Sequence, residues 1–200
     1  KYENKQLCRK YLEMAEKTKK SFDEKFYNEE KHCLYDVLGD SKVRPNQLFA
    51  LSLSHPIVDN AEIAEQILST VENKLLNKYG LKTLSSDEDG YVDVYEGSAY
   101  KRDSSYHQGI TWPWLLGLYY DALKNTMIIE KNRTKRQELE EKITKLVYTT
   151  KETFKAEMFE RSSIGTISEI YDSTEPYEER GAFAQAWSVA EIFRIVLNKR

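Results

Sequence analysis

The chain has 200 residues, of which 40% are hydrophobic and 32% charged, with a formal net charge of −3. This composition is typical of a protein with a hydrophobic core and excludes a disordered or collagen-like chain. With a pI of about 5.8 and no basic stripe, nucleic acid is not an expected partner.

The chain carries no sequence signal for a membrane or for export. No run approaches the roughly 18 apolar residues of a membrane helix, and residues 1–10 are charged and polar, unlike a signal peptide. Cys8 and Cys33 lack the spacing of metal ligands and favour a reducing compartment. We therefore expect a cytoplasmic protein that folds as one domain over residues 1–200, without a cofactor, a resident metal or a membrane partner.

The first two predicted helices differ in character. Apolar residues spaced by three and four predict an amphipathic helix over 4–27, with lysines and glutamates on its other face. After a loop over 28–44, Pro45 suits the first turn of a short apolar helix over 46–53.

Four more helices follow. A capping pattern at Asp59 and Glu62 begins an amphipathic helix over 59–79, which Gly80 can end. The stretch 80–105 is predicted to be irregular, with Asp87–Gly90 a turn rather than a calcium loop, because the later ligands are absent. The remaining helices are predicted at 112–125, from 133 to about 158, and at 183–197.

The alternation of these helices predicts two layers. The helices at 46–53, 112–125 and 183–197 are apolar around most of their circumference and must be enclosed, whereas the other three have one apolar stripe and can cover them. The long loops over 28–44, 80–105 and 159–182 each precede an inner helix, so we expect them at one end of the molecule, where sites are commonly built. No strand alternation is visible, so the predicted class is all-α.

Glu169 is the most informative single residue of the loop over 159–182. It lies between Ile167 and Ile170 in Gly165–Asp172 (GTISEIYD), and burying an unpaired carboxylate among apolar groups costs several kcal/mol. A salt-bridged or helix-capping carboxylate is the plain structural interpretation, and a functional group is the other.

Four ordered motifs carry a resemblance to a known family. They are Arg44–Ala50 (RPNQLFA), Tyr106–Gly117 (YHQGITWPWLLG), Gly165–Asp172 and Ala184–Glu191 (AQAWSVAE). In this order they resemble the C-terminal end of glycogen debranching enzymes, the amylo-α-1,6-glucosidase type, from about Arg44 to Leu197.

The resemblance implies a fold and a reaction. It implies an (α/α)6 toroid of six helical hairpins, of which this sequence holds three, with inverting hydrolysis of α-1,6 branch stubs in glycogen or limit dextrin. Glu169 matches the family's general base. The family's general acid is an Asp in a Trp-Met-Asp motif that this sequence lacks, and Asp103 and Asp172 do not have its context. The isolated chain is therefore expected to be inactive.

Other residues suit a carbohydrate ligand. Tryptophan faces can stack on sugar C–H groups, and paired amides can bind hydroxyl groups. The candidate substrate-binding residues are Asn46, Gln47, Glu96, His107, Gln108, Trp112, Gln185 and Trp187. Trp114 is assigned to the core, and a structural role is the alternative for each of the others.

Three functions stay open at this point. The first is the debranching glucosidase, with α-glucan as substrate and with the missing half of the toroid, or a second copy in a homodimer, covering the exposed helix edges. The second keeps hydrolysis but takes a glucoamylase- or trehalase-like substrate. The third is a non-catalytic helical fragment that binds α-glucan or a protein partner, which the absent acid favours.

Overall fold

The computed structural model describes residues 4–161 and 164–197. More than half of these residues are helical, in α1 (Lys5–Lys25), α2 (Phe49–Ser52), α3 (Ala61–Lys74), α4 (Ala99–Ser105), α5 (Leu115–Ile129), α6 (Arg133–Glu160) and α7 (Ala186–Leu197), with a 3-10 turn, η1 (Pro45–Leu48), before α2. The predicted all-α class is confirmed. No helix in the described part of the chain is both long and apolar enough to cross a membrane.

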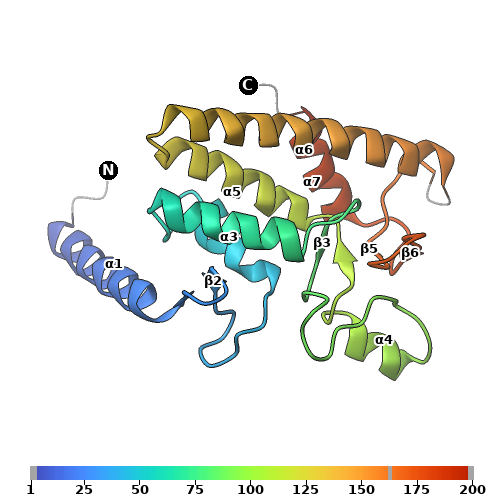
Figure 1. The fold of residues 1–200 in the computed structure, drawn as a ribbon, viewed down its shortest axis with the longest axis horizontal. Coiled ribbons are helices and arrows are strands. Elements are labelled where there is room, and N and C mark those ends of the chain that lie inside the picture. Colours follow the sequence, from blue (N-terminus) through green and yellow to red (C-terminus); the bar gives the residue numbers. More distant parts are fainter. Residues whose placement is uncertain (1–3, 162–163, 198–200) are drawn as a thin grey trace.

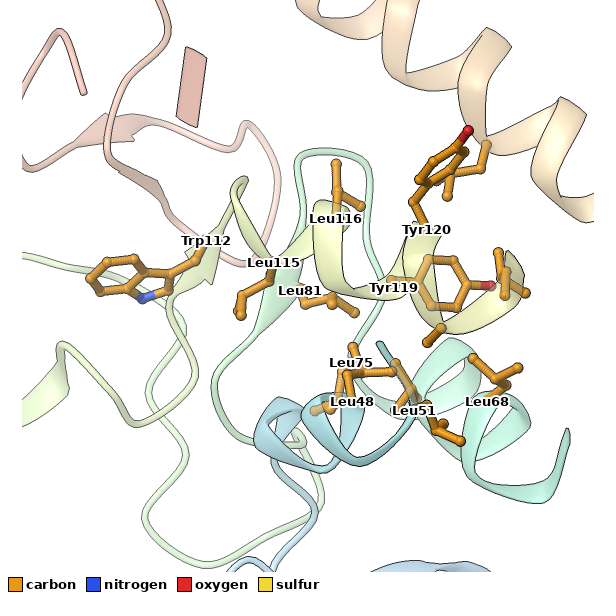
Figure 2. Close-up of a cluster of buried hydrophobic side chains, with 14 of the residues drawn as sticks. Leu48, Leu51, Leu68, Leu75, Leu81, Trp112, Leu115, Leu116, Tyr119 and Tyr120 are labelled. Atoms are coloured by element: carbon orange, nitrogen blue, oxygen red, sulfur yellow. The ribbon is translucent and has the colours of Figure 1, made fainter. Parts of the chain in front are cut away.

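The core is built around α5. This helix packs against α2 and α3 on one side and against α6 and α7 on the other, and α6 also packs on α7. Figure 1 shows α6, α5 and α3 side by side, with α7 beneath α6. Leucines from α2, α3 and α5 interdigitate with the two α5 tyrosines, Tyr119 and Tyr120 (Figure 2). The predicted contacts between inner and outer helices are therefore present for the helices from α2 onward.

The joint between α5 and α7 depends on a small residue and a branched ion pair. Arg194 of α7 donates to Asp121 (2.9 Å) and to the Gly117 carbonyl (3.1 Å), and it also pairs with Glu191. A Cβ at Gly117 would overlap the Glu191 carboxylate. Glycine therefore lets the two inner helices approach closely enough for Arg194 to reach α5.

α1 departs from the predicted two layers. Asn4 caps it by accepting from Leu7 N–H at 3.0 Å, as its polar start suggests. However, none of its residues is buried, and only Phe22 and Phe26 near its end pack against the core. Figure 1 shows α1 projecting away from the body of the molecule. The apolar stripe was predicted correctly, but only its last two residues, Phe22 and Phe26, reach the core, and the rest covers no inner helix of this chain.

Short strands were missed. β1 (Tyr27–Asn28) pairs with β2 (Cys33–Leu34), and β3 (Leu81–Lys82), β4 (Thr111–Trp112), β5 (Ile170–Tyr171) and β6 (Glu179–Arg180) form an antiparallel sheet in that order. Two residues per strand are too few for alternation to show in a sequence. This sheet brings the segments around residues 81, 111, 170 and 180 side by side.

Several boundaries also need correction. The helix expected over 112–125 begins at Leu115, because Trp112 belongs to β4. The helix expected over 59–79 begins after Asn60, whose side chain accepts from Glu62 and Ile63 N–H, and ends at Lys74. The irregular stretch 80–105 contains α4, which Ser98 caps.

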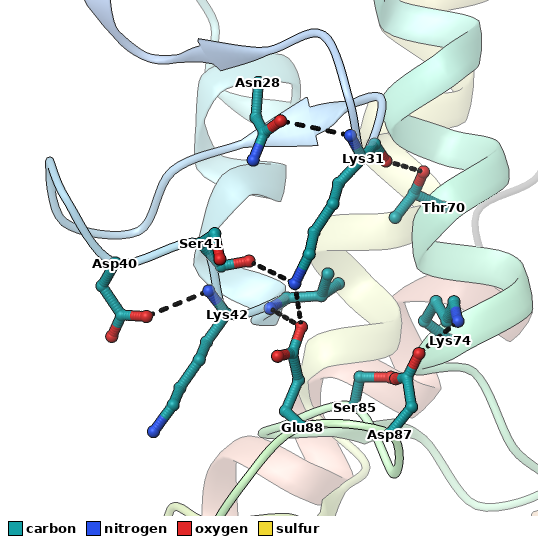
Figure 3. Close-up of polar contacts among 11 residues, drawn as sticks. Asn28, Lys31, Asp40, Ser41, Lys42, Thr70, Lys74, Ser85, Asp87 and Glu88 are labelled. Carbon is teal, nitrogen blue, oxygen red and sulfur yellow. Dashed lines mark hydrogen bonds and ion pairs between the residues drawn. The ribbon is translucent and has the colours of Figure 1, made fainter.

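The three long loops meet, as predicted. Glu88 accepts from Lys31 Nζ (2.7 Å) and from Val43 N–H (3.1 Å), which joins the loop over 28–44 to the turn at 85–90 (Figure 3). Asp87 pairs with Lys74 and accepts from Ser85, and hydrogen bonds from both lower the pKa of Asp87 to about 2. The turn therefore serves as an ion-paired joint. Further along, Ser173 N–H donates to the Asp93 carbonyl at 2.7 Å and brings in the third loop, whose residues 162 and 163 lie outside the described ones.

Candidate active site

Glu169 lies immediately before β5, at the end of an inner strand of the sheet. Its neighbours Ile167, Ser168, Ile170 and Tyr171 are buried, whereas Glu169 itself is half-buried. Its backbone N–H donates to the Ala182 carbonyl at 2.9 Å, and Ala182 N–H donates to Glu169 Oε2 at 2.9 Å. The apolar neighbours thus hold the segment in the core while the carboxylate reaches its surface.

Gly181 makes the contact with Ala182 available. Its φ of +71° lies in the left-handed region, and a Cβ there would overlap Glu169 Oε2. Both the backbone turn and the close approach therefore require glycine.

The other carboxylate oxygen is held by Tyr106. The Tyr106 hydroxyl donates to Glu169 Oε1 across 63 residues of sequence. Burial of the phenol, followed by this hydrogen bond, raises the pKa of Tyr106 above its usual value. Tyr106 therefore keeps its proton, and since Ala182 N–H can only donate, each oxygen of the Glu169 carboxylate accepts a hydrogen bond from one of these two groups.

Tyr106 also belongs to an aromatic cluster of five residues beside Glu169, made of Tyr106, His107, Trp112, Trp114 and Trp187. The Tyr106 ring meets the rings of His107 and Trp112 edge-on, with 4.7 Å between ring centroids in each pair. The His107 ring stacks on Trp112 with 5.3 Å between the ring centroids. The Trp187 ring packs on Trp112 and on Trp114, with ring centroids 5.8 Å and 5.7 Å apart respectively.

Exposure varies across this cluster. Trp112 is 4% exposed and fixed by a hydrogen bond from Nε1 to the Tyr106 carbonyl (3.3 Å), while Trp187 is 45% exposed. The neighbouring Phe183 is 77% exposed. Flat apolar faces on a fixed base suit the C–H face of a sugar ring.

Arg44 organises the polar side of the cluster. Its guanidinium donates to the His107 carbonyl (2.8 Å), the Thr83 carbonyl (3.1 Å) and Gln108 Oε1 (3.0 Å). Partial burial of the ring lowers the pKa of His107, and the nearby charge of Arg44 lowers it further. The ring is therefore neutral over most of the physiological pH range. The predicted residues His107 and Trp112 thus contact Tyr106, the partner of Glu169, and Trp187 joins them through Trp112. Gln108 is held beside them by Arg44.

Asn46 and Gln47 line a different hollow, together with Phe22, Phe26 and Phe49. Asn46 donates to Asp36 at 2.8 Å. Gln47 is 5% exposed, accepts from Leu34 N–H (3.2 Å) and donates to the Arg44 carbonyl (2.8 Å). Burial therefore gives Gln47 a structural task, and neither amide is brought to the Glu169 cluster.

Gln185 and Glu96 take intermediate positions. Gln185 N–H donates to the Ile167 carbonyl at 3.0 Å, which fastens the start of α7 next to Glu169. Glu96 is exposed, and its negative charge makes a small contribution to the raised pKa of Arg180, after the larger effect of Asp172. Arg180 pairs with Asp172 at 2.7 Å, and Asp172 also accepts from Tyr95 N–H at 2.8 Å. Asp172 is thus a buried structural carboxylate that holds the sheet edge.

The family model described as amylo-alpha-1,6-glucosidase matches residues 2–194. The chain belongs to the amylo-α-1,6-glucosidase family. The resemblance drawn from the four motifs is thereby confirmed, and a debranching-type glycosidase relationship follows for the whole length of the match.

Some residues of this family member's site were missed in the sequence. Tyr106 and Arg44 are the first residues of two quoted motifs, but only the amides and rings that follow them carry the usual signal of a carbohydrate site. Both act through contacts more than 60 positions away, which no local pattern reveals. Gly181 had a weak signal, as a glycine between charged and apolar segments.

Proposed function

We propose that this chain supplies the general base of an inverting α-1,6-glucosidase site that acts on branch stubs of glycogen or limit dextrin. The observation that carries the proposal is the Glu169 carboxylate, half-buried beside an aromatic cluster and contacted by the donors Tyr106 and Ala182. Both partners donate to the carboxylate, and a carboxylate held in this way beside a ligand site is suited to accept a proton from water.

The proposed reaction is a single displacement. A water near Glu169 gives its proton to the carboxylate while its oxygen attacks the anomeric carbon from the face opposite the branch linkage. A second carboxylic acid protonates the leaving oxygen, and in inverting glycosidases the two carboxyl groups lie about 6.5–9.5 Å apart. That acid is expected in a Trp-Met-Asp motif outside this sequence. The product is glucose of inverted anomeric configuration.

The aromatic cluster supports a role in substrate positioning. Trp187, which is 45% exposed, would stack on the sugar, and the buried Trp112 would support it from below. The amide of Gln108 and the neutral ring of His107 would bind hydroxyl groups. Gln185 and Glu96 would contribute from the rim, and Asn46 would act only at a more distant part of the glucan, whereas the buried Gln47 would hold the fold and not contact the ligand. Two free cysteines, one exposed and one buried, support a reducing, cytoplasmic location.

The exposed helix edges support a partner. The apolar residues of α1, with Phe193 and Leu197 of α7, are open to solvent in this chain, and apolar patches of a few hundred Å² usually mark interfaces. We propose that the other half of a toroid, or a second copy of the chain, covers them.

Glu169→Gln in the complete protein tests the proposed base. It keeps the shape of the side chain but removes the proton acceptor, so kcat for glucose release from limit dextrin should fall about 10²–10⁴-fold. Glu178→Gln, an exposed carboxyl in the same loop, is the matched control and should leave kcat unchanged.

A second arm identifies the chemistry. With α-glucosyl fluoride as substrate, Glu169→Ala should be reactivated by azide, which forms a C1–N bond as the C1–F bond breaks and fluoride leaves, giving the β-glucosyl azide. Retention of most of the kcat by Glu169→Gln would show that Glu169 is structural. If the parent releases glucose from glucans of another linkage rather than from limit dextrin, and Glu169→Gln loses that activity, the glucoamylase-like alternative is favoured.

A further inference from the structure

The two oxygens of the Glu169 carboxylate accept hydrogen bonds from two distant segments, one from the Tyr106 hydroxyl and one from Ala182 N–H, which follows Gly181. We propose that Tyr106 and Gly181 are positioning residues that fix the orientation of the Glu169 carboxylate, so that one rotamer faces the water. This inference rests on the proposed role of Glu169 as the base.

The Tyr106 side of this arrangement is rigid because Tyr106 itself is held at several points. Its N–H donates to the Arg102 carbonyl (3.0 Å) at the end of α4, and its own carbonyl accepts from Trp112 Nε1 (3.3 Å). Its ring is packed against Tyr95, His107 and Trp112. The hydroxyl that meets Glu169 Oε1 therefore has little freedom, as an effective positioning group requires.

The Gly181 side depends on the β5–β6 register. Ile170 pairs with Arg180, so Glu169 and Gly181 follow as the next opposed positions, just beyond the ladder. The left-handed φ at Gly181 turns Ala182 N–H toward Glu169 Oε2. Any side chain at 181 would be strained by its φ and would also push against that oxygen.

Each carboxylate oxygen thus accepts one protein hydrogen bond, and the remaining lone pairs are left for the water. Displacing a reacting group by about 1 Å can cost about 10²-fold in rate. Removing the hydrogen-bond partner that orients a metal ligand costs about 10–100-fold, and we expect an effect of this size for an oriented base. Because the proposed role of Tyr106 and Gly181 is to orient Glu169, the loss should appear in kcat rather than in KM.

The experiment compares Tyr106→Phe and Gly181→Ala with two matched controls in the complete protein. Tyr95→Phe removes a neighbouring hydroxyl, and Gly165→Ala replaces another loop glycine with positive φ (+78°) that has no heavy atom within 4 Å of a built Cβ. Tyr106→Phe and Gly181→Ala should each lower kcat on limit dextrin about 10–100-fold, with KM changed less than about threefold. The controls should stay within about threefold of the parent for both constants.

A double-variant cycle separates positioning from other roles. In a Glu169→Ala background assayed with α-glucosyl fluoride and azide, adding Tyr106→Phe should change the rate less than about threefold, because groups that act as a unit are not additive. The same loss in that background would mean that Tyr106 acts on the substrate itself, and would overturn the inference. Circular dichroism and thermal unfolding check that each variant is folded. If Gly181→Ala is not folded, the kcat of Tyr106→Phe alone tests the inference.

The outcomes distinguish the two levels of proposal. If Glu169→Gln keeps its kcat, the proposed function fails. If Glu169→Gln is inactive while Tyr106→Phe keeps its kcat, the base stands and the positioning inference is wrong.

Discussion

Glu157 is the most deeply buried carboxyl group described in the structure, with 0% of its surface exposed. It accepts from the Tyr171 hydroxyl at 2.9 Å and lies 3.3 Å from Arg161 Nε. Burial, the largest effect, raises the pKa of Glu157 to about 7, although the charge of Arg161 opposes the rise. Tyr171 belongs to β5, and Glu169 lies immediately before this strand, so the Glu157 carboxyl supports the strand that carries the proposed base.

The raised pKa of Glu157 links protonation to stability. Between the ordinary carboxyl pKa of 4.5 and the folded value of about 7, the folded protein holds a proton that the unfolded chain has released. The free energy of unfolding therefore falls as pH rises through this window and levels off above it. Below pH 4.5 both states are protonated and the penalty vanishes.

Glu157→Gln should remove this penalty. Chemical denaturation should show that the variant, relative to the parent, gains stability between pH 5 and pH 8, by about 3 kcal/mol at most at 1.36 kcal/mol per pKa unit. The amide oxygen that this substitution introduces can still accept from the Tyr171 hydroxyl. Glu160→Gln, an exposed carboxyl on the same helix, is the control. A stability difference that does not change with pH would contradict the assignment.

At the scale of elements, α1 and α3 are both amphipathic, but only α3 buries its stripe. Ala64, Ile67, Leu68 and Val71 of α3 are buried, whereas Leu7, Tyr11 and Met14 of α1 are all exposed. Periodicity measures the segregation of apolar residues along a helix, and this segregation is equally strong whether the partner surface is in the same chain or in another molecule.

Substitutions in these two helices should therefore have different effects. Leu7→Ser with Tyr11→Ser should change the free energy of unfolding of this chain by less than about 0.5 kcal/mol, the range of ordinary surface changes. Ile67→Ala should cost about 2–5 kcal/mol because it leaves a cavity in the core. Denaturant titration of both variants measures the contrast, and a large loss for the α1 variant would mean that α1 packs on the body in solution.

At the scale of the whole molecule, solvent-exposed apolar residues are found on several elements. Besides α1, they include Phe159 of α6 and Trp187, Phe193 and Leu197 of α7. A hollow between α6 and α7 is lined by Phe154, Ile192 and Phe193, among other residues of the two helices. At about 25 cal/mol per Å² of apolar surface, leaving such edges wet consumes a sizeable part of a domain's narrow stability margin.

The 200-residue chain by itself is therefore expected to associate and to lack glucosidase activity. It carries one proposed catalytic carboxylate, and a two-fold dimer would cover apolar edges while supplying only a second base. Light scattering should show a species larger than a monomer, and a glucose-release assay on limit dextrin should show no activity. A stable monomer that frees glucose from limit dextrin would contradict both parts.

Much of this molecule follows from local sequence. The stripes of α3 and α6 and the apolar character of α5 and α7 are properties of neighbouring residues, so their positions were predicted to within a few residues. The four ordered motifs, one of which contains Glu169, were together enough to identify the family. The two-residue strands and the polar, seven-residue α4 were missed because segments so short contain too few periods of any pattern.

Tertiary structure alone decided what surrounds Glu169 and what happens to each amphipathic face. The sequence by itself determined which residues are apolar, the approximate positions of the long helices and which family motif contains the carboxylate. It did not show that Tyr106 and Gly181 meet that carboxylate, that Gln47 is buried, or that the stripe of α1 faces solvent. These outcomes depend on contacts between segments tens of residues apart, and the geometry of such contacts exists only once the helices have packed and the short strands have paired.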